Sequence, residues 1–184
     1  MIEKAGLRHG ETILVHAGTS GVGSAAIQIA RLKGARVVAT VGSDAKCEAA
    51  KRLGADHAIN YQTDDFVAGV RDFCRSVDVV FEHVGGSTFE GSLRCLARGG
   101  RLVTCGTTDG EAVVEINLRR LFFKNLVLIG NTMGSRVQAL QVIEHAARGE
   151  LKPVIDTVLP MIDVGKAHER LETRAAIGKV IVTP

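Results

Sequence analysis

Three closely spaced glycines mark the most informative segment of this 184-residue chain, HAGTSGVG, which follows the apolar run TILVH. Glycines at such a junction permit a tight turn and a close approach of the backbone to a ligand, and the free amides of a following helix attract a pyrophosphate. The spacing is G-x-x-G-x-G instead of the standard G-x-G-x-x-G, and we expect the helix to begin at Ser24. We predict a dinucleotide-phosphate site at Gly18, Gly21 and Gly23; the alternative is an ordinary strand-to-helix turn.

The end of the next apolar run bears on which dinucleotide such a site would bind. An NAD site usually has an acidic residue there, about 20 residues past the glycines, which binds the ribose 2′-hydroxyl. Here the run ends in Val41, Gly42 and Ser43, and the first acid is Asp44. Ser43 and Lys46 suit a 2′-phosphate, which favours NADP, although NAD stays possible. In the alternative interpretation, Ser43 or Asp44 only caps a helix that carries Lys46 on its solvated side.

Six short β-branched runs, separated by amphipathic segments, would position these residues. The runs span residues 12–16, 36–41, 56–60, 77–84, 101–106 and 126–130. Near-continuous apolar strands that alternate with helices are typical of a parallel sheet covered on both faces. We therefore predict an α/β fold, a doubly wound parallel six-stranded Rossmann sheet with the strand order 3-2-1-4-5-6.

The pattern changes after the sixth run. We predict a helix from Ser135 to about Arg148, an extended segment over 151–160, a helix from Asp163 to about Thr173 and a strand over 179–183. Because this C-terminal extension does not continue the alternation, we expect it to pack on another element, and without one its strand would be an unpaired apolar edge. We place a dinucleotide-binding domain at 1–150 and the C-terminal segment at 151–184.

Composition and charge exclude several other classes of protein. The net charge of +3 is scattered, and the basic group at 119, 120 and 124 is interrupted by apolar residues. We interpret that group as an amphipathic helix with a solvated basic face and expect no nucleic-acid partner. No apolar run approaches the roughly 20 residues that span a bilayer, and the charged start MIEKAGLRHGE does not resemble a signal peptide. We expect a cytoplasmic protein with no membrane partner.

The cysteines and histidines do not form a metal-binding pattern. The four cysteines lack Cys-x-x-Cys spacing and the six histidines are scattered, so we expect reduced thiols and no metal site. Two other dinucleotide-fold classes fit poorly. A short-chain dehydrogenase needs Tyr-x-x-x-Lys, but Asp65 stands four residues after the only tyrosine, Tyr61. A methyltransferase normally has an acid at the end of its second strand.

Several separate motifs, in this order, resemble the medium-chain dehydrogenase/reductase superfamily, near its quinone oxidoreductase and zinc-type alcohol dehydrogenase-like branches. They are VHAGTSGVGSAAIQIARLKGARVVATVGSDAK, LGADHAINY, VDVVFEHVGG, GGRLVTCG, LRRLFFKNLVLIGNTMGS and GKVIVTP, and they cover almost the whole chain. The resemblance implies that Gly18, Gly21, Val22 and Gly23 lie under the pyrophosphate. It also implies that Ser43, Lys46 and Tyr61 approach the adenosine 2′-phosphate, which supports NADP.

The resemblance also implies a second group of cofactor contacts. Val84, Gly85, Gly106 and Thr107 resemble positions that line the nicotinamide ribose, and Asn131 and Thr132 resemble positions near the carboxamide. For each of these residues, an ordinary strand-to-loop turn is the alternative. Relatives pair their sixth strand across a two-fold axis, which implies a homodimer through residues 126–130.

The resemblance further implies the NADP(H)-binding domain of an oxidoreductase that transfers hydride between nicotinamide and a quinone, enone, aldehyde or alcohol. The superfamily places a GroES-like catalytic domain before this region, and the resemblance implies that the segment 151–184 returns to complete that domain. The catalytic domain also carries most metal ligands of the zinc branch. Because this sequence begins just before its first strand, we expect that domain to be absent and assign no catalytic residues. The alternative is a non-catalytic NAD(P)-binding module, or a half-enzyme that needs a separate catalytic domain.

Overall fold

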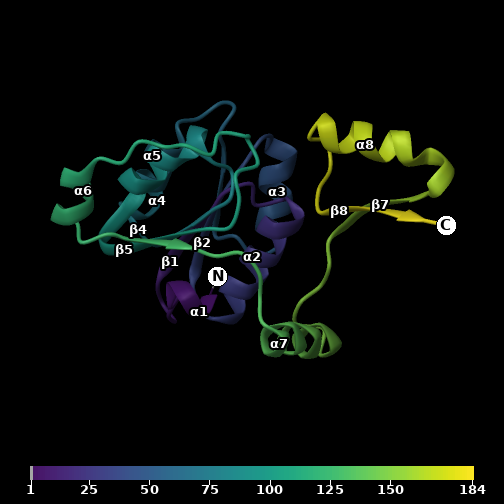
Figure 1. Ribbon diagram of the computed structural model, residues 1–184, viewed down its shortest axis with the longest axis horizontal. Helices are drawn as coiled ribbons and strands as arrows, with labels where there is room; N and C mark the ends of the chain where they lie inside the picture. Colours follow the sequence, from purple (N-terminus) through teal and green to yellow (C-terminus); the bar gives the residue numbers. More distant parts are fainter. Residues whose placement is uncertain (1) are drawn as a thin grey trace.

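A computed structural model describes residues 2–184 and contains two separate sheets (Figure 1); Met1 lies outside the described residues. The larger sheet consists of β1 (Thr12–Val15), β2 (Arg36–Val41), β3 (His57–Asn60), β4 (Val77–Glu82), β5 (Leu96–Thr104) and β6 (Val127–Gly130). All neighbouring strands in it are parallel, and their order is β3-β2-β1-β4-β5-β6. The predicted doubly wound six-stranded sheet and its strand order are therefore confirmed.

Helices cover both faces of the larger sheet. The helices on this part of the chain are α1 (Ile2–Ala5), α2 (Gly21–Leu32), α3 (Asp44–Arg52), α4 (Phe66–Cys74) and α5 (Gly86–Cys95). Side chains alternate between the two faces of a strand, so Ile13 and Val15 pack in one core with α1, α2 and α3. Leu14 packs in the other core with α4 and α5. These two apolar cores fix the sheet between its helical layers.

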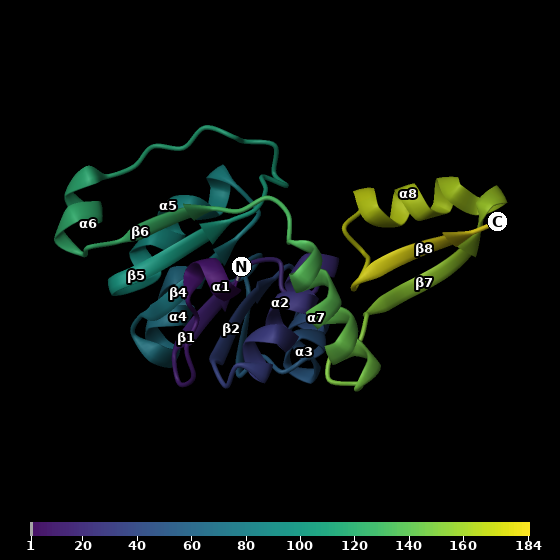
Figure 2. The same cartoon turned by 60° about the horizontal axis from the view of Figure 1, so that its bottom comes forward.

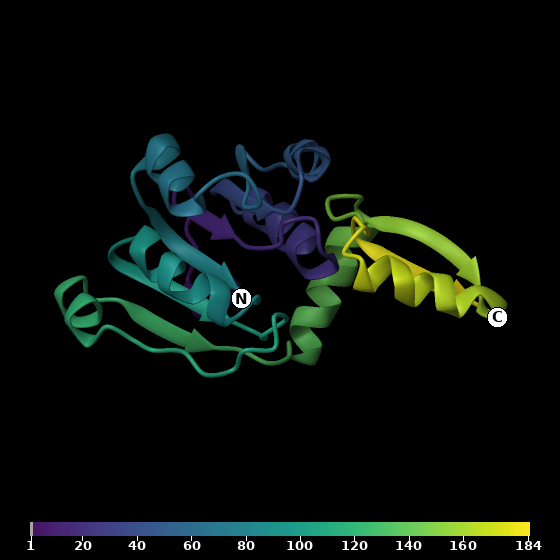
Figure 3. The same cartoon turned by 90° about the horizontal axis from the view of Figure 1, so that it is seen from above.

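Residues 155–183 form a second, smaller unit, the C-terminal unit. Helices α6 (Leu118–Phe123) and α7 (Arg136–Ala147) precede β7 (Ile155–Pro160), a short 3₁₀ helix (Met161–Asp163), α8 (Val164–Glu172) and β8 (Lys179–Thr183). Strand β8 pairs in parallel with β7, so the predicted C-terminal strand is not unpaired. A parallel pair needs a crossover connection, which α8 provides. Figures 1 and 3 show this unit projecting to one side of the larger sheet, beyond α7.

Several predicted boundaries are wrong by a few residues. Helix α2 begins at Gly21 and not at Ser24, because the Ser20 side chain caps it and accepts a hydrogen bond from the amide of Gly23 at 2.9 Å. Strand β5 begins at Leu96, before the glycine pair at 99–100, and ends at Thr104. Strand β4 ends at Glu82, so the two residues after it belong to a loop. These shifts leave the strand ends, where ligands bind in such sheets, in the predicted order.

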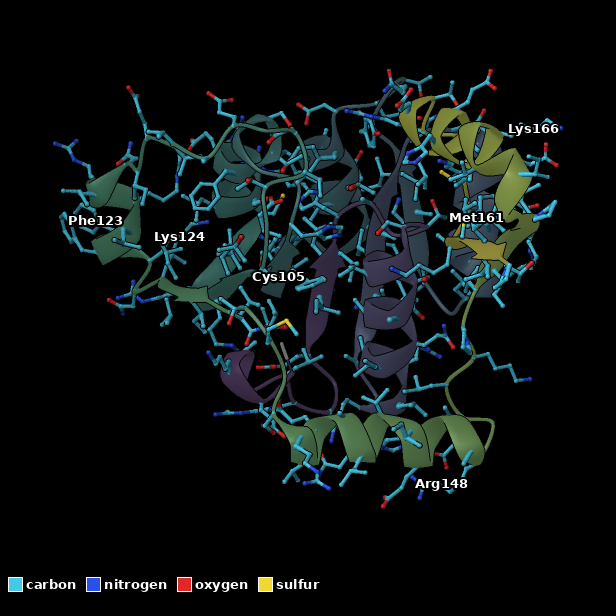
Figure 4. The ribbon with its side chains drawn as sticks, turned by 45° about the vertical axis from the view of Figure 1, so that its right-hand side comes forward. Cys105, Phe123, Lys124, Arg148, Met161 and Lys166 are labelled. Carbon is cyan, nitrogen blue, oxygen red and sulfur yellow. The ribbon has the colours of Figure 1, made fainter. Side chains whose placement is uncertain are left out.

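Apolar side chains remain exposed at both ends of the molecule. Phe123 on α6 and Met161 beside α8 lie at opposite ends of Figure 4, with exposed fractions of 61% and 55%. The helix predicted around the basic group at 119–124 is present as α6, but no residue of it is fully buried, and Arg120 pairs with Glu90. Its apolar side chains Leu118, Phe122 and Phe123 are exposed to solvent, whereas an amphipathic surface helix normally packs its apolar face against the protein. Among residues 2–184, no helix is both long enough and apolar enough to cross a membrane.

Candidate cofactor site

The glycine turn between β1 and α2 is shaped by contacts that admit no side chain at two of its positions. A Cβ atom at Gly18 would lie 2.8 Å from the Cβ atom of Ala39, and one at Gly23 would lie 2.2 Å from the carbonyl oxygen of Ala17. The amide of Gly18 donates to the carbonyl of Thr40 at 3.0 Å, which fixes the turn on β2. Ala17 has a φ of 46°, a left-handed conformation that non-glycine residues seldom adopt. The turn therefore follows a backbone path that demands glycine at 18 and 23.

The start of α2 presents free amides and no competing negative charge. No acidic residue lies in its first turn. Val22, in that turn, is 45% exposed, so the amino end of the helix is reachable from solvent. The first amides of a helix have no partners within the helix, and the helix dipole adds partial positive charge there. This geometry suits a phosphate group.

Ser43, Lys46 and Tyr61 gather at the ends of β2 and β3. The Ser43 hydroxyl caps α3 and accepts from the Lys46 amide at 3.3 Å, as the capping interpretation expected. The Tyr61 hydroxyl lies 2.8 Å from the place where a Cβ atom of Gly42 would be. The neighbouring carboxylate of Asp44 accepts from the Asn60 side-chain amide at 2.8 Å. The three predicted residues thus share one surface, and the first acid after β2 is held by a neighbour.

The Lys46 ammonium group donates a hydrogen bond to the carbonyl oxygen of Arg174, which lies in the C-terminal unit. Burial lowers the pKa of Lys46, and the nearby Asp156 carboxylate opposes that shift. Lys46 therefore does not point freely into solvent, so this part of the capping interpretation is wrong. Its side chain connects α3 to the C-terminal unit.

The remaining predicted site residues lie directly after the other three strands of this part of the sheet. Val84 and Gly85 follow β4, Gly106 and Thr107 follow β5, and Asn131 and Thr132 follow β6. Backbone hydrogen bonds join these loops: the amide of Asn131 donates to Thr104 at 2.9 Å, and that of Asp109 donates to Val84 at 2.8 Å. All thirteen predicted positions therefore lie at the carboxyl edge of the sheet, where open α/β sheets bind ligands. The contact assigned to each of them stays a prediction.

Two contacts from the C-terminal unit at the glycine turn were missed in the sequence. The amide of Gly178 donates to the Thr19 carbonyl at 2.7 Å, and Gly178 forms an isolated bridge with Ser20. The Lys179 side chain then covers Gly21, since a Cβ atom there would lie 2.2 Å from Lys179 Cε and 2.6 Å from Nζ. A cation more than 150 residues away in the chain is thus brought to the start of α2. No local sequence signal connects it with the glycine turn.

A second connection anchors the chain between the two units. The Gln28 side chain on α2 donates to the Lys152 carbonyl at 3.0 Å and accepts from the Lys152 amide at 2.9 Å. Figure 2 shows α7 in front of α2 and α3, with the chain running from it into β7. The paired amide contacts hold this connection against α2, so the C-terminal unit approaches the glycine turn from a fixed side.

The cysteines are poorly suited to nucleophilic chemistry. All four carry free thiols. Burial raises the pKa of Cys95 to about 12 and also raises that of Cys105, which directly follows β5 and is labelled in Figure 4. A thiol with a raised pKa is mostly protonated at neutral pH and a weak nucleophile. Within residues 2–184, no group of three His, Cys, Asp or Glu side chains is placed to hold a metal ion.

Comparisons with known proteins agree with this geometry. The family described as zinc-binding dehydrogenase matches residues 21–148. Acryloyl-coenzyme A reductase of Metallosphaera sedula is 32% identical over 182 residues, which cover 99% of this chain and 53% of that protein. The chain spans about half the length of the curated relatives it matches.

Two crystal structures extend the likeness to three dimensions. An NAD-dependent alcohol dehydrogenase is 37% identical with a TM-score of 0.89, and the match covers all of this chain and 54% of that one. Quinone oxidoreductase of Escherichia coli, complexed with NADPH, is 32% identical with a TM-score of 0.85, and the match covers 97% of this chain and 58% of that one.

Proposed function

The chain belongs to the zinc-binding dehydrogenase family of the medium-chain dehydrogenase/reductase superfamily, and on this premise we propose that it is the NADP(H)-binding domain of an oxidoreductase. The observation that carries the proposal is the glycine turn, whose Gly18 and Gly23 admit no side chain and which faces the amino end of α2. We take residues 1–150 as the dinucleotide-binding domain and 151–184 as the C-terminal segment that in relatives returns to the catalytic domain. A bound nicotinamide would supply the hydride chemistry.

The residues around the turn fit a pyrophosphate. The free amides of α2 would donate to its oxygens, and the exposed Val22 leaves the helix end open. Lys179 lies over Gly21 and would add a positive charge beside those amides. Two sources of positive potential on one short turn favour a doubly charged group over a neutral ligand.

The choice of NADP over NAD depends on Lys46. The end of β2 has no carboxylate that is free for a ribose 2′-hydroxyl, since Asp44 is bonded to Asn60. Lys46 would exchange the Arg174 carbonyl for the 2′-phosphate, with Ser43 and Tyr61 beside it. The two structural relatives differ in the cofactor that their names state, NAD in one and NADPH in the other. The residues at the end of β2 therefore carry this part of the proposal.

A fluorescence titration with NADPH and with NADH tests both statements. We expect NADPH to bind more tightly, and Lys46→Glu to weaken NADPH binding by about tenfold or more while NADH binding changes less. Lys51→Glu is the matched control, because it makes the same charge change on the same helix at an exposed position, where Lys51 pairs with Glu48. Equal affinity for both dinucleotides in the wild type and in Lys46→Glu would refute the preference for NADP. Absence of binding to either would refute the function.

We propose that the full activity is hydride transfer between nicotinamide and a quinone, enone, aldehyde or alcohol. The names of the relatives support this range without choosing within it. The second candidate is a non-catalytic binding module, or a half-enzyme that needs a separate catalytic domain, and the observation that favours it is that the chain spans about half the length of its curated relatives. Turnover of a quinone or aldehyde by the chain alone supports the first candidate. Cofactor binding without turnover supports the second.

We also propose a homodimer through β6. This strand is at the end of the sheet and pairs with β5 alone among the described strands, and its Val127 is 48% exposed. An edge strand offers unpaired backbone groups to a second copy of the same strand. Light scattering at micromolar concentration should give the dimer mass, and Val127→Lys should shift it toward the monomer. A monomeric wild type would refute the proposal.

A further inference from the structure

A buried polar network lies below the cofactor site, between β1 and β4. Its central members are His16, Thr40, Glu82 and Ser92, and each of them is at most 2% exposed. Buried polar groups in native proteins are hydrogen-bonded, and an unpaired one is costly. The functions proposed above use none of these side chains. Their arrangement therefore requires its own explanation.

The Glu82 carboxylate is the acceptor at the centre of the network. One oxygen accepts from the backbone amides of Val84 at 2.8 Å and Gly85 at 3.3 Å. The other accepts from the hydroxyls of Thr88 at 2.8 Å and Ser92 at 2.9 Å. Two of the four donors are thus backbone amides of the loop after β4, and two belong to the helix that follows it. Glu82 ties that loop to α5.

The imidazole ring of His16 connects Thr40 to Ser92. Burial lowers the pKa of His16, so its ring is neutral at pH 7. The ring's Nδ1 lies 2.8 Å from the Thr40 hydroxyl and its Nε2 lies 2.8 Å from the Ser92 hydroxyl. When Ser92 donates to Glu82, Nε2–H donates to the Ser92 hydroxyl and Thr40 donates to Nδ1. This chain of donors ends on a carboxylate oxygen of Glu82. The Thr88 carbonyl, 2.8 Å from the Ser92 hydroxyl, is the other acceptor for the Ser92 proton.

The network lies where the order of the sheet reverses. The chain passes from β1 to β2 and β3 on one side, and β4 then pairs with β1 on the other. Such a switch point opens a crevice between the loops at the carboxyl ends of the two strands. His83 Nε2 donates to the carbonyl of His16 at 2.8 Å, so the loops after β1 and β4 are also joined directly. Both walls of the crevice rest on this network.

Gly85 shows how tightly the second wall is defined. Its φ is 124°, and a Cβ atom there would lie 2.1 Å from a carboxylate oxygen of Asp109. Only glycine adopts such a conformation readily, and its amide points to Glu82. The loop therefore follows a path that requires glycine at position 85, and a buried acceptor holds it there.

We infer that Glu82 is a positioning residue that fixes the Val84–Gly85 loop in its cofactor-binding shape before the dinucleotide arrives. The inference rests on the proposed function, because it assumes that the crevice beside this loop receives the cofactor. A preformed loop binds more tightly, since no ordering of the backbone has to accompany binding. The effect of Glu82 on affinity acts through the two amides alone, without contact to the ligand.

Glu82→Gln and Glu82→Met form a matched pair of variants with similar length. The glutamine oxygen can accept from Val84 and Gly85, and its amino group can donate to the two hydroxyls, which also act as acceptors. Methionine fills the space but leaves both backbone amides without a partner. We expect Glu82→Gln to bind NADPH within about threefold of wild type and Glu82→Met to bind about tenfold more weakly, at a temperature where circular dichroism shows both folded. Equal affinity of Glu82→Met and wild type would overturn the inference.

Amide hydrogen exchange provides a second readout that needs neither the cofactor nor a variant that folds well. In the wild type without cofactor, the amides of Val84 and Gly85 should exchange far more slowly than that of Gly110, which lies in an exposed turn. Glu82→Gln should keep this protection. Fast exchange of Val84 and Gly85 in the wild type would overturn the inference. If the wild type fails to bind NADPH while both amides are protected, the proposed function has failed and the positioning role stands.

Discussion

Replacement of Gly23 by alanine should lower the free energy of unfolding by about 2–3 kcal/mol, whereas the same replacement at Gly21 should change it by less than about 1 kcal/mol. Both glycines lie in the first turn of α2. The added methyl group is identical, so the difference depends only on the atoms that it would meet. The pair therefore tests whether the glycine turn is shaped as described.

The magnitude follows from the neighbouring atoms. A Cβ atom at Gly23 would lie 2.2 Å from the Ala17 carbonyl oxygen and 2.8 Å from Gly18 Cα, and these backbone atoms cannot rotate away. Overpacking costs about 1–3 kcal/mol, and a contact of 2.2 Å with a backbone atom lies in the upper part of that range, about 2–3 kcal/mol. A displaced Ser20 cap adds about 1 kcal/mol. The better helix propensity of alanine returns at most about 1 kcal/mol.

At Gly21 the three atoms nearest to the methyl group would all belong to the Lys179 side chain, with Cε closest at 2.2 Å. The end of a lysine side chain is flexible and can move to another rotamer, so the fold should tolerate the change. Displacement of Lys179 should instead weaken NADPH binding, because its charge leaves the start of α2. Gly21→Ala should thus separate binding from stability.

Urea unfolding can measure both variants. Far-UV circular dichroism and the fluorescence of the only tyrosine, Tyr61, report on the larger sheet, since Tyr61 directly follows β3. With a slope of about 2 kcal/mol per molar urea, the midpoint for Gly23→Ala should fall by about 1 M or more, and that for Gly21→Ala by less than about 0.5 M. Equal shifts for the two variants, or an unchanged Gly23→Ala, would refute the described packing of the turn.

Three further predictions concern other parts of the molecule. Acidification from pH 7 to pH 5 should destabilise the protein, because burial lowers the pKa of His16 and the unfolded chain therefore takes up a proton at higher pH than the folded chain. His16→Gln should reduce the pH slope of the unfolding free energy by up to about 1.4 kcal/mol per pH unit. An unchanged slope would contradict this prediction. Gln28→Ala removes both hydrogen bonds to Lys152, so limited proteolysis should cleave the segment 148–153 faster. The free energy of unfolding in urea should fall by about 1 kcal/mol. Unaltered cleavage would argue against a role of Gln28 in holding this segment. Asp56→Ala should lower the free energy of unfolding by about 1–2 kcal/mol, because the Asp56 carboxylate accepts from the Val37 amide at 2.7 Å. Asp56 also forms an ion pair with the half-exposed Arg31, and Arg31→Ala should cost less than about 0.5 kcal/mol. Urea unfolding of both variants will measure these changes.

Much of the fold was predictable because its signals are local. Each strand of the larger sheet is a short apolar run, and right-handed crossovers leave few arrangements for six parallel strands. Helix α7 begins after Ser135, which forms a capping box with Gln138, and Gly149 follows its end with a φ of 71°. Each of these features depends on residues that lie within a few positions of one another. The carboxyl edge of the sheet, with the thirteen predicted site residues, follows from the same strand order.

Element boundaries were less predictable because they depend on single hydrogen bonds. Helix α2 starts three residues before the predicted Ser24, since the Ser20 hydroxyl accepts from Gly23. Strand β5 continues through the glycine pair at 99–100, where the amide of Gly99 bonds to the carbonyl of Lys124. Glycine normally interrupts a strand pattern. Strand β5 nevertheless continues here, because the backbone at Lys124 bonds to Gly99.

The sequence by itself determined the class of fold, the strand order and the glycine turn, because periodicity and turn chemistry are written in neighbouring residues. Only the tertiary structure decided which residues of the C-terminal unit reach the cofactor site and which buried side chains lie next to that site. Lys46 meets the carbonyl of Arg174 across 128 positions of the chain, and His16 meets Ser92 across 76. Such contacts form where separate segments pack together, and no local pattern of residue types encodes which distant segment will arrive.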